Sequence, residues 1–149
     1  MKLQHIFIGA TLVLVACSTK IAQQKEAAQN IDMQGQWYIE NIVFNDSNYV
    51  CPGEEVSGSR QYITFDRDGY FIQTNCNTFS GSYSISGDTL TLGDGAMTEM
   101  ACDNMATEEA MRKLIMRAAN IDTENDSIMR LNFIDTGAYI ILRKATEKK

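Results

Sequence analysis

Four cysteines and one histidine are the side chains of this 149-residue sequence with the greatest capacity for nucleophilic or metal chemistry. Cys76 lies in the stretch NCNTFSGSY at residues 75–83, between two asparagines and ahead of a Ser-Gly-Ser run. A cysteine in such a loop serves as a nucleophile, a metal ligand or one half of a disulfide. Its role depends on the available bases and on the redox compartment of the protein.

The N-terminal segment has the features of a bacterial lipoprotein signal peptide. Lys2 precedes an apolar run at residues 6–15, which fits a signal-peptide h-region and is too short to span a bilayer. The run ends in LVACS at residues 14–18, which resembles a lipobox. We therefore expect residues 1–16 to be removed and Cys17 to carry a lipid anchor, so that a membrane is one partner. The alternative is an ordinary cleavage site with an unrelated cysteine nearby.

Removal of this leader also removes His5, the only histidine in the chain. The mature chain then has neither a Ser-His-Asp nor a Cys-His arrangement, and no zinc site that uses histidine. Loss of Lys2 leaves 12 of the 13 basic side chains against 19 acidic ones, a formal net charge of −7, which argues against nucleic acid as a partner. We expect no enzymatic activity, cofactor or metal.

The mature chain has the length of one domain behind a short tether. Residues 17–33 are rich in Gln and Ala and lack aromatic side chains, so we expect them to form a flexible tether that lifts a domain at 34–145 off the membrane. Residues 146–149 form a polar tail. No acidic cluster directly follows Cys17, which favours an anchor in the outer membrane with the domain facing the periplasm.

Short strands separated by turn residues dominate the domain. Apolar residues occur on both sides of a first strand at 36–44, with Trp37, Ile39 and Val43 on one side and Ile42 on the other. Three hairpins are predicted from tight turns that contain Gly. Their turns lie at residues 66–69, 87–88 and 135–137.

One helix interrupts the strands. Met111, Leu114, Ile115 and Ala118 fall at i, i+3, i+4 and i+7 and predict an apolar stripe, with Thr107 as the N-cap. The pattern predicts a mainly β (α+β) fold, a small antiparallel curled sheet or β-barrel with one helix inserted before the last hairpin. We expect the helix to plug or close the barrel.

Three cysteines remain once Cys17 is lipidated. In an oxidising compartment, Cys51, Cys76 and Cys102 allow at most one bridge and one leftover thiol. The residues alone leave open a Cys76–Cys102 bridge, a bridge through Cys51, buried free thiols or a three-thiolate zinc site. A nucleophilic Cys76 is disfavoured, because no histidine activates it and no Lys or Arg is near it in the sequence.

Two motifs resemble the META domain family, which includes HslJ-like bacterial lipoproteins. They are the stretch NCNTFSGSY at 75–83 and the segment TEMAC at 98–102, followed by Met105, Glu108 and Leu114. GQW at residues 35–37 also resembles the family's first strand, and the resemblance covers about residues 34–143. Asn75 stands where the family usually has Gly, which suggests a left-handed backbone at Asn75 or Asn77. We expect Gly81 to permit close packing of the chain.

The resemblance implies a compact, mostly β domain with one helix and a disulfide between Cys76 and Cys102. Glu99 stands where a basic residue is common in the family, which weakens any binding role of that position. The family implies no established enzymatic activity and is loosely tied to envelope stress, motility and secretion. We therefore expect a non-catalytic envelope protein that acts through a partner contact. The alternative is a barrel that holds a small lipid or amphipathic ligand in an apolar cavity.

Overall fold

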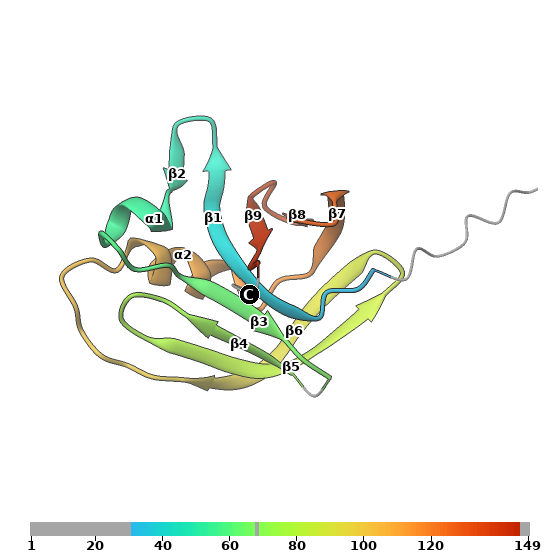
Figure 1. Cartoon of the computed structure of the whole chain (residues 1–149), viewed down its shortest axis with the longest axis horizontal. Helices are drawn as coiled ribbons and strands as arrows, with labels where there is room; N and C mark the ends of the chain where they lie inside the picture. The colour runs from blue at the N-terminus through green and yellow to red at the C-terminus, as the bar shows by residue number, and fades with distance from the viewer. Residues whose placement is uncertain (1–30, 68, 147–149) are drawn as a thin grey trace, which may run out of the picture.

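The described residues of the computed structural model, 31–67 and 69–146, fold into a mainly β structure around a closed antiparallel barrel (Figure 1). Cys17 and the rest of residues 1–30 lie outside the described part of the chain. Eight strands form the barrel, and the short strand β2 pairs only with β1 beside it. The elements are β1 (Gly35–Asn45), β2 (Asn48–Val50), α1 (Pro52–Glu55), β3 (Tyr62–Phe65), β4 (Tyr70–Gln73), β5 (Thr78–Ser86), β6 (Thr89–Met97), α2 (Ala106–Leu114), β7 (Ala119–Asn125), β8 (Ile128–Phe133) and β9 (Tyr139–Lys144).

Antiparallel pairing joins neighbouring strands from β3 to β9, and β1 closes the barrel by pairing with both β3 and β9. The three predicted hairpins correspond to β3–β4, β5–β6 and β8–β9. Gly87 and Gly137 supply φ angles of 65° and 70° in the second and third turns, which only glycine adopts readily. Close packing requires glycine at residue 69, since a Cβ there would lie 2.3 Å from the carbonyl oxygen of Gly81.

A β-bulge in β1 changes which side chains point into the barrel. Ile39 pairs with Leu142 but Asn41 pairs with Ile141, so Glu40 is an extra residue in the strand. The bulge shifts the alternation by one, and Ile42 is fully buried on the same side as Ile39. The predicted separation of these two residues onto opposite faces is therefore wrong.

The helix α2 contributes its apolar stripe to the barrel core, as its sequence pattern predicts. Met111, Leu114 and Ile115 are buried and pack in the same cluster as the inward side chains of the strands. The helix ends at Leu114, so Ala118 lies beyond it. A void between α2 and the strands has a volume of only about 10 Å³, which is room for one water molecule at most. The barrel is therefore filled by its own side chains.

The strand β7 was not among the sequence predictions. It joins β6 through only two residue pairs, Thr89 with Asn120 and Leu90 with Ala119, whereas it pairs with β8 along most of its length. Among the pairings between consecutive strands of the barrel, that of β6 with β7 has the fewest residue pairs.

Met33 packs into the core at the N-terminal entry to the barrel. Met33 is only 2 % exposed, and its carbonyl oxygen accepts a hydrogen bond of 2.8 Å from the indole nitrogen of Trp37. The packed part of the chain thus includes residue 33, which the sequence pattern assigned to the tether. Among the described residues, none of the helices is long and apolar enough to cross a membrane.

Candidate functional site

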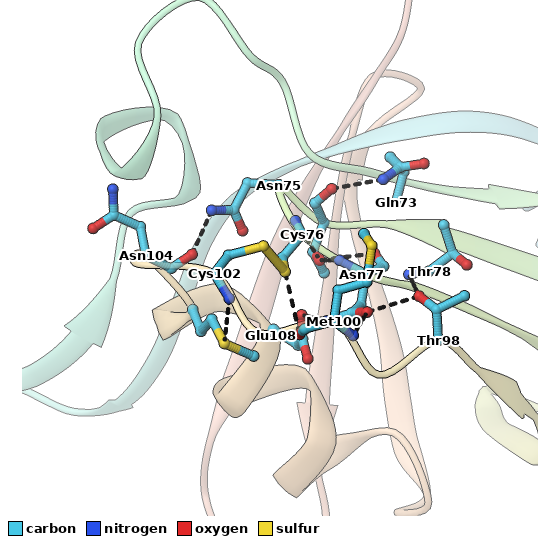
Figure 2. The surroundings of a disulfide bond; sticks show 12 residues. Gln73, Asn75, Cys76, Asn77, Thr78, Thr98, Met100, Cys102, Asn104 and Glu108 are labelled. Carbon is cyan, nitrogen blue, oxygen red and sulfur yellow. Dashed lines mark hydrogen bonds between the residues drawn. A yellow bond between two sulfur atoms is a disulfide. The ribbon is translucent and has the colours of Figure 1, made fainter.

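The two sequence motifs meet at one corner of the barrel, where a disulfide joins Cys76 to Cys102 (Figure 2). This is the pair that the family resemblance implies. Cys76 is buried in the turn between β4 and β5, and Cys102 is exposed in the segment between β6 and α2. Their Cα atoms lie 6.1 Å apart at a sequence separation of 26. The bond therefore fixes the long β6–α2 connection to the turn between β4 and β5.

Asn77 holds the same connection by hydrogen bonds. Its side chain has no exposed surface, and Nδ2 donates to the carbonyl oxygen of Met100 at 2.8 Å. Oδ1 accepts from the backbone nitrogen of Met100 at 2.7 Å and from the hydroxyl of Thr98 at 2.8 Å. One amide thus satisfies three groups of the connection, independently of the disulfide beside it.

Glu108 is a fully buried carboxylate on α2 at the base of this corner. Its Oε2 accepts a hydrogen bond of 2.6 Å from Nδ2 of Asn77. Its Oε1 accepts from Nε and Nη2 of Arg112, one helical turn later, at 3.1 and 2.8 Å. Burial of a charge is tolerated only with such partners. Both oxygens are engaged, so this carboxylate serves to lock α2 against the sheet.

A second cluster lies around Gln61, which is 2 % exposed. Its Nε2 donates to Oε2 of Glu55 at 2.8 Å and to the hydroxyl of Thr107 at 3.2 Å, and its Oε1 accepts from the backbone nitrogen of Asn75 at 3.1 Å. Gln61 thereby connects α1, α2 and the turn that carries Cys76.

The predicted role of Thr107 as an N-cap is wrong. The N-cap residue of α2 is Met105, whose side chain makes no capping hydrogen bond. Both carboxylate oxygens of Glu55 instead lie 3.3 Å from the backbone nitrogen of Thr107. A negative charge from a distant segment caps the positive end of the helix, so the hydroxyl of Thr107 is free to bind Gln61.

The backbone at the motif asparagines differs from the expectation. Within the described residues, positive φ angles occur only at glycines, so neither Asn75 nor Asn77 is left-handed. The expected close packing at Gly81 is confirmed, because a Cβ there would lie 2.9 Å from the carbonyl oxygen of Asp94 and 3.0 Å from the ring of Tyr70.

Cys51 is the free cysteine of the described chain and is partly buried. Burial raises the pKa of its thiol, and the negative charge of Glu54 raises it further. Cys51 lines a shallow groove of about 210 Å³ together with Gly53, Arg60 and Gln61. A raised pKa keeps the thiol protonated at neutral pH, so Cys51 is a poor nucleophile.

The corner as a whole is built to hold structure in place. Its amides, hydroxyls and carboxylates bind one another, apart from Oδ1 of Asn75, which is buried without a hydrogen-bond partner among the described residues, and its two cysteines are oxidised. Over residues 31–67 and 69–146, His, Cys, Asp and Glu side chains form no group of three suited to a metal ion. No sequence pattern indicates the roles of Glu55 and Gln61 in these contacts. For Glu108 a signal existed, since it precedes Met111 by three residues and Ile115 by seven and so falls on the apolar stripe.

Comparison with known proteins gives a family and three similar folds. The family model of the META domain matches residues 29–146. An NMR structure of a protein from Burkholderia xenovorans is 19 % identical with a TM-score of 0.65 over 81 % of this chain and 88 % of that one. A second NMR structure is 18 % identical with a TM-score of 0.56, over 74 % and 89 % of the two chains. A crystal structure of a DUF4847 family protein from Bacteroides vulgatus is 12 % identical with a TM-score of 0.52, over 79 % and 97 %. No curated protein matches the sequence.

Proposed function

The chain belongs to the META domain family, and from this premise we propose that it is a lipid-anchored cell-envelope protein whose domain acts through contact with another protein. Cys17 is the anchored residue, the outer membrane is the site of attachment and the domain faces the periplasm. The role of such a contact is in envelope maintenance or stress tolerance rather than in catalysis.

The observation that carries this proposal is the filled interior of the barrel. A drug-sized ligand needs a pocket of roughly 300 Å³ or more, whereas the void between α2 and the strands holds about 10 Å³. The inner side chains of all eight strands and of α2 are used for packing. The packed interior gives no support to a lipid held inside the barrel, and we place the function on the outer surface, which includes an open cleft of about 510 Å³ beside Trp37, Met129 and Lys144.

The disulfide supports an envelope location. Disulfides persist in oxidising compartments such as the bacterial periplasm and are rare where thiols are kept reduced. The Cys76–Cys102 bond fixes a connection of the fold and leaves Cys51 as the free thiol within residues 31–67 and 69–146. Together with the lipobox-like LVACS at residues 14–18, it is consistent with export followed by anchoring.

Mass spectrometry of the native protein tests the anchor and the disulfide together. The protein is purified from membranes and its intact mass is taken before and after reduction. We expect an N-terminal peptide that begins at Cys17 and carries acyl chains, and a gain of two hydrogens on reduction. Cys17→Ser should move the protein from the membrane to the soluble fraction. An unmodified Cys17 in the native protein would refute the anchoring proposal.

The location of the domain is tested in intact cells. Protease added outside should leave the domain intact, and it should degrade the domain once the outer membrane is permeabilised. Degradation in intact cells would instead place the domain on the cell surface. A soluble periplasmic protein of known location is the control for the integrity of the membrane.

A further inference from the structure

One outer face of the barrel combines arginine and tyrosine side chains from four segments. We call it the arginine–tyrosine face, and it consists of Tyr38, Arg60, Tyr62, Arg130, Tyr139 and Arg143. The strands β8, β9, β1 and β3 lie next to one another in the barrel (Figure 1). Their outward side chains therefore share one surface.

Strand register aligns the centre of this face. Tyr38 on β1 lies directly opposite Arg143 on β9 and, on its other side, directly opposite Tyr62 on β3. The neighbouring residues Trp37, Ile63 and Leu142 are buried, so the row Arg143–Tyr38–Tyr62 points outward. Tyr139 lies four residues before Arg143 on β9, which places it on the same side of the sheet.

The cations on this face are held in place by their neighbours. The guanidinium of Arg60 lies 4.0 Å from the ring centre of Tyr38, and that of Arg130 lies 3.7 Å from the ring centre of Tyr139. Glu40, the extra residue of the β1 bulge, accepts a hydrogen bond from Arg60 at 2.8 Å and is 3.3 Å from Nε of Arg143. Such preorganisation lowers the entropic cost of binding. Arg60 and Arg143 nevertheless keep 56 % and 51 % of their side chains exposed.

The charge of the face opposes that of the chain. The face carries three arginines, of which Arg60 and Arg143 contact the carboxylate of Glu40, and Glu54 lines the same groove as Arg60. The whole sequence, by contrast, has a net charge of −6. The nearest acidic neighbour by register is Asp122 on β7, opposite Arg130, but the guanidinium of Arg130 turns toward Tyr139 on the other side. A local excess of cations on an acidic protein favours an acidic partner and disfavours pairing of this face with the same face of a second copy.

We propose that the arginine–tyrosine face is the docking surface of this domain for an acidic segment of another protein. The inference rests on the proposed partner contact and names its location and chemistry. Tyrosine and arginine are the residue types enriched in protein–protein hot spots, and arginine binds carboxylates in a bidentate manner. A membrane surface would instead favour large apolar side chains that project beside the cations. The tyrosines here are half-buried under or beside guanidinium groups.

Site-specific photocrosslinking in the native host tests the location. A benzophenone amino acid replaces Tyr62 on the proposed face in one full-length variant, and in another it replaces Ser84, which is exposed on β5. We expect an adduct with another protein at position 62 and none at 84, with acidic residues in the crosslinked peptide. An adduct from 84 alone would overturn the inference and leave the partner contact intact. Absence of adducts from both positions would overturn both.

Charge reversal tests the chemistry. Arg143→Glu in the position-62 variant should reduce the adduct about tenfold. Lys113→Glu on α2 makes the same change in net charge away from the face and should leave the adduct unchanged. Equal loss in both variants, or none in either, would refute the role of the face. Unchanged thermal unfolding temperatures establish that the variants are folded.

Two further measurements distinguish the proposed partner from a membrane surface and from a second copy of this chain. The first uses the purified protein without its lipid anchor. Vesicles of phosphatidylglycerol should bind it no better than vesicles of phosphatidylcholine. Anionic vesicle binding that is lost in Arg143→Glu would assign the face to the membrane and overturn the proposal. An adduct at position 62 with the mass of two copies of this chain would assign it to self-association and would equally overturn it.

Discussion

Replacement of Asn77 by alanine should destabilise the domain strongly although it removes no charge and little apolar surface. The side chain is fully buried and satisfies Glu108, Thr98 and both backbone groups of Met100. A hydrogen bond to a charged group contributes about 1.5–3 kcal/mol and a neutral one about 0.5–1.5 kcal/mol. The groups of Met100 lie near solvent and will be rehydrated in part. We expect a loss of about 3–5 kcal/mol.

This loss is comparable with that from the neighbouring disulfide. The chain-entropy model gives roughly 3.5 kcal/mol for a bond that closes a loop of this length. Urea unfolding of oxidised Asn77→Ala and of the double variant Cys76→Ser/Cys102→Ser provides the comparison. Asn48→Ala, at an exposed asparagine of β2, is the control and should change the free energy of unfolding by less than about 0.5 kcal/mol.

The pH dependence distinguishes hydrogen bonding from simple loss of packing. Asn77→Asp places a second carboxylate beside that of Glu108, so one of the two is protonated more readily in the folded state than in the unfolded state. The folded state then binds the additional proton, and the stability of this variant should rise as the pH falls from 7 to 5. Asn77→Ala should lack this rise. A loss below about 1 kcal/mol for Asn77→Ala would refute the reasoning, because water would then replace the amide without cost.

Three further predictions concern crowding, capping and the free thiol. Gly95→Ala should cost about 3 kcal/mol or prevent folding, because the new Cβ would lie 1.7 Å from a carbonyl oxygen of β5. Gly53→Ala is the control and should be neutral or stabilising, because nothing lies within 4 Å of its Cβ position. Thermal unfolding measures both variants. Glu55→Ala should cost about 1–2 kcal/mol in urea unfolding, because it leaves the N-terminus of α2 uncapped. Cys51 should react with iodoacetamide only at higher pH than an exposed cysteine, since its pKa is raised; Glu54→Gln should shift the reaction partway back, because burial is the larger cause.

The parts of the fold that could be predicted depend on short stretches of sequence. Gly87 and Gly137 each sit in a turn between alternating strands, and the local requirement for a positive φ decides the hairpin. The stripe of Met111, Leu114 and Ile115 decides which side of α2 is buried. Both signals lie within a few residues of the structure they specify.

The missed features depend on contacts between distant segments. The strand β7 has only two buried side chains, Ala119 and Ile121, and becomes a strand because β8 needs a partner on that side. The bulge at Glu40 follows from matching β1 to β9 at the far end of the chain. The cap of α2 comes from Glu55, which lies 52 residues before the nitrogen that it binds. No short stretch of the sequence contains both members of such a contact, so local patterns could not predict it.

The closure of the barrel by β1 and β9 also constrains when the domain can fold. The first strand needs the last one as its neighbour, at a separation of roughly one hundred residues, so contacts of high sequence separation dominate the topology. An emerging chain lacks the partner of β1 until its final strand is available, and such long-range closure is slow. The pairing that completes the barrel therefore also sets the latest point in folding, because β1 has no neighbour on that side until the C-terminal strand β9 is available.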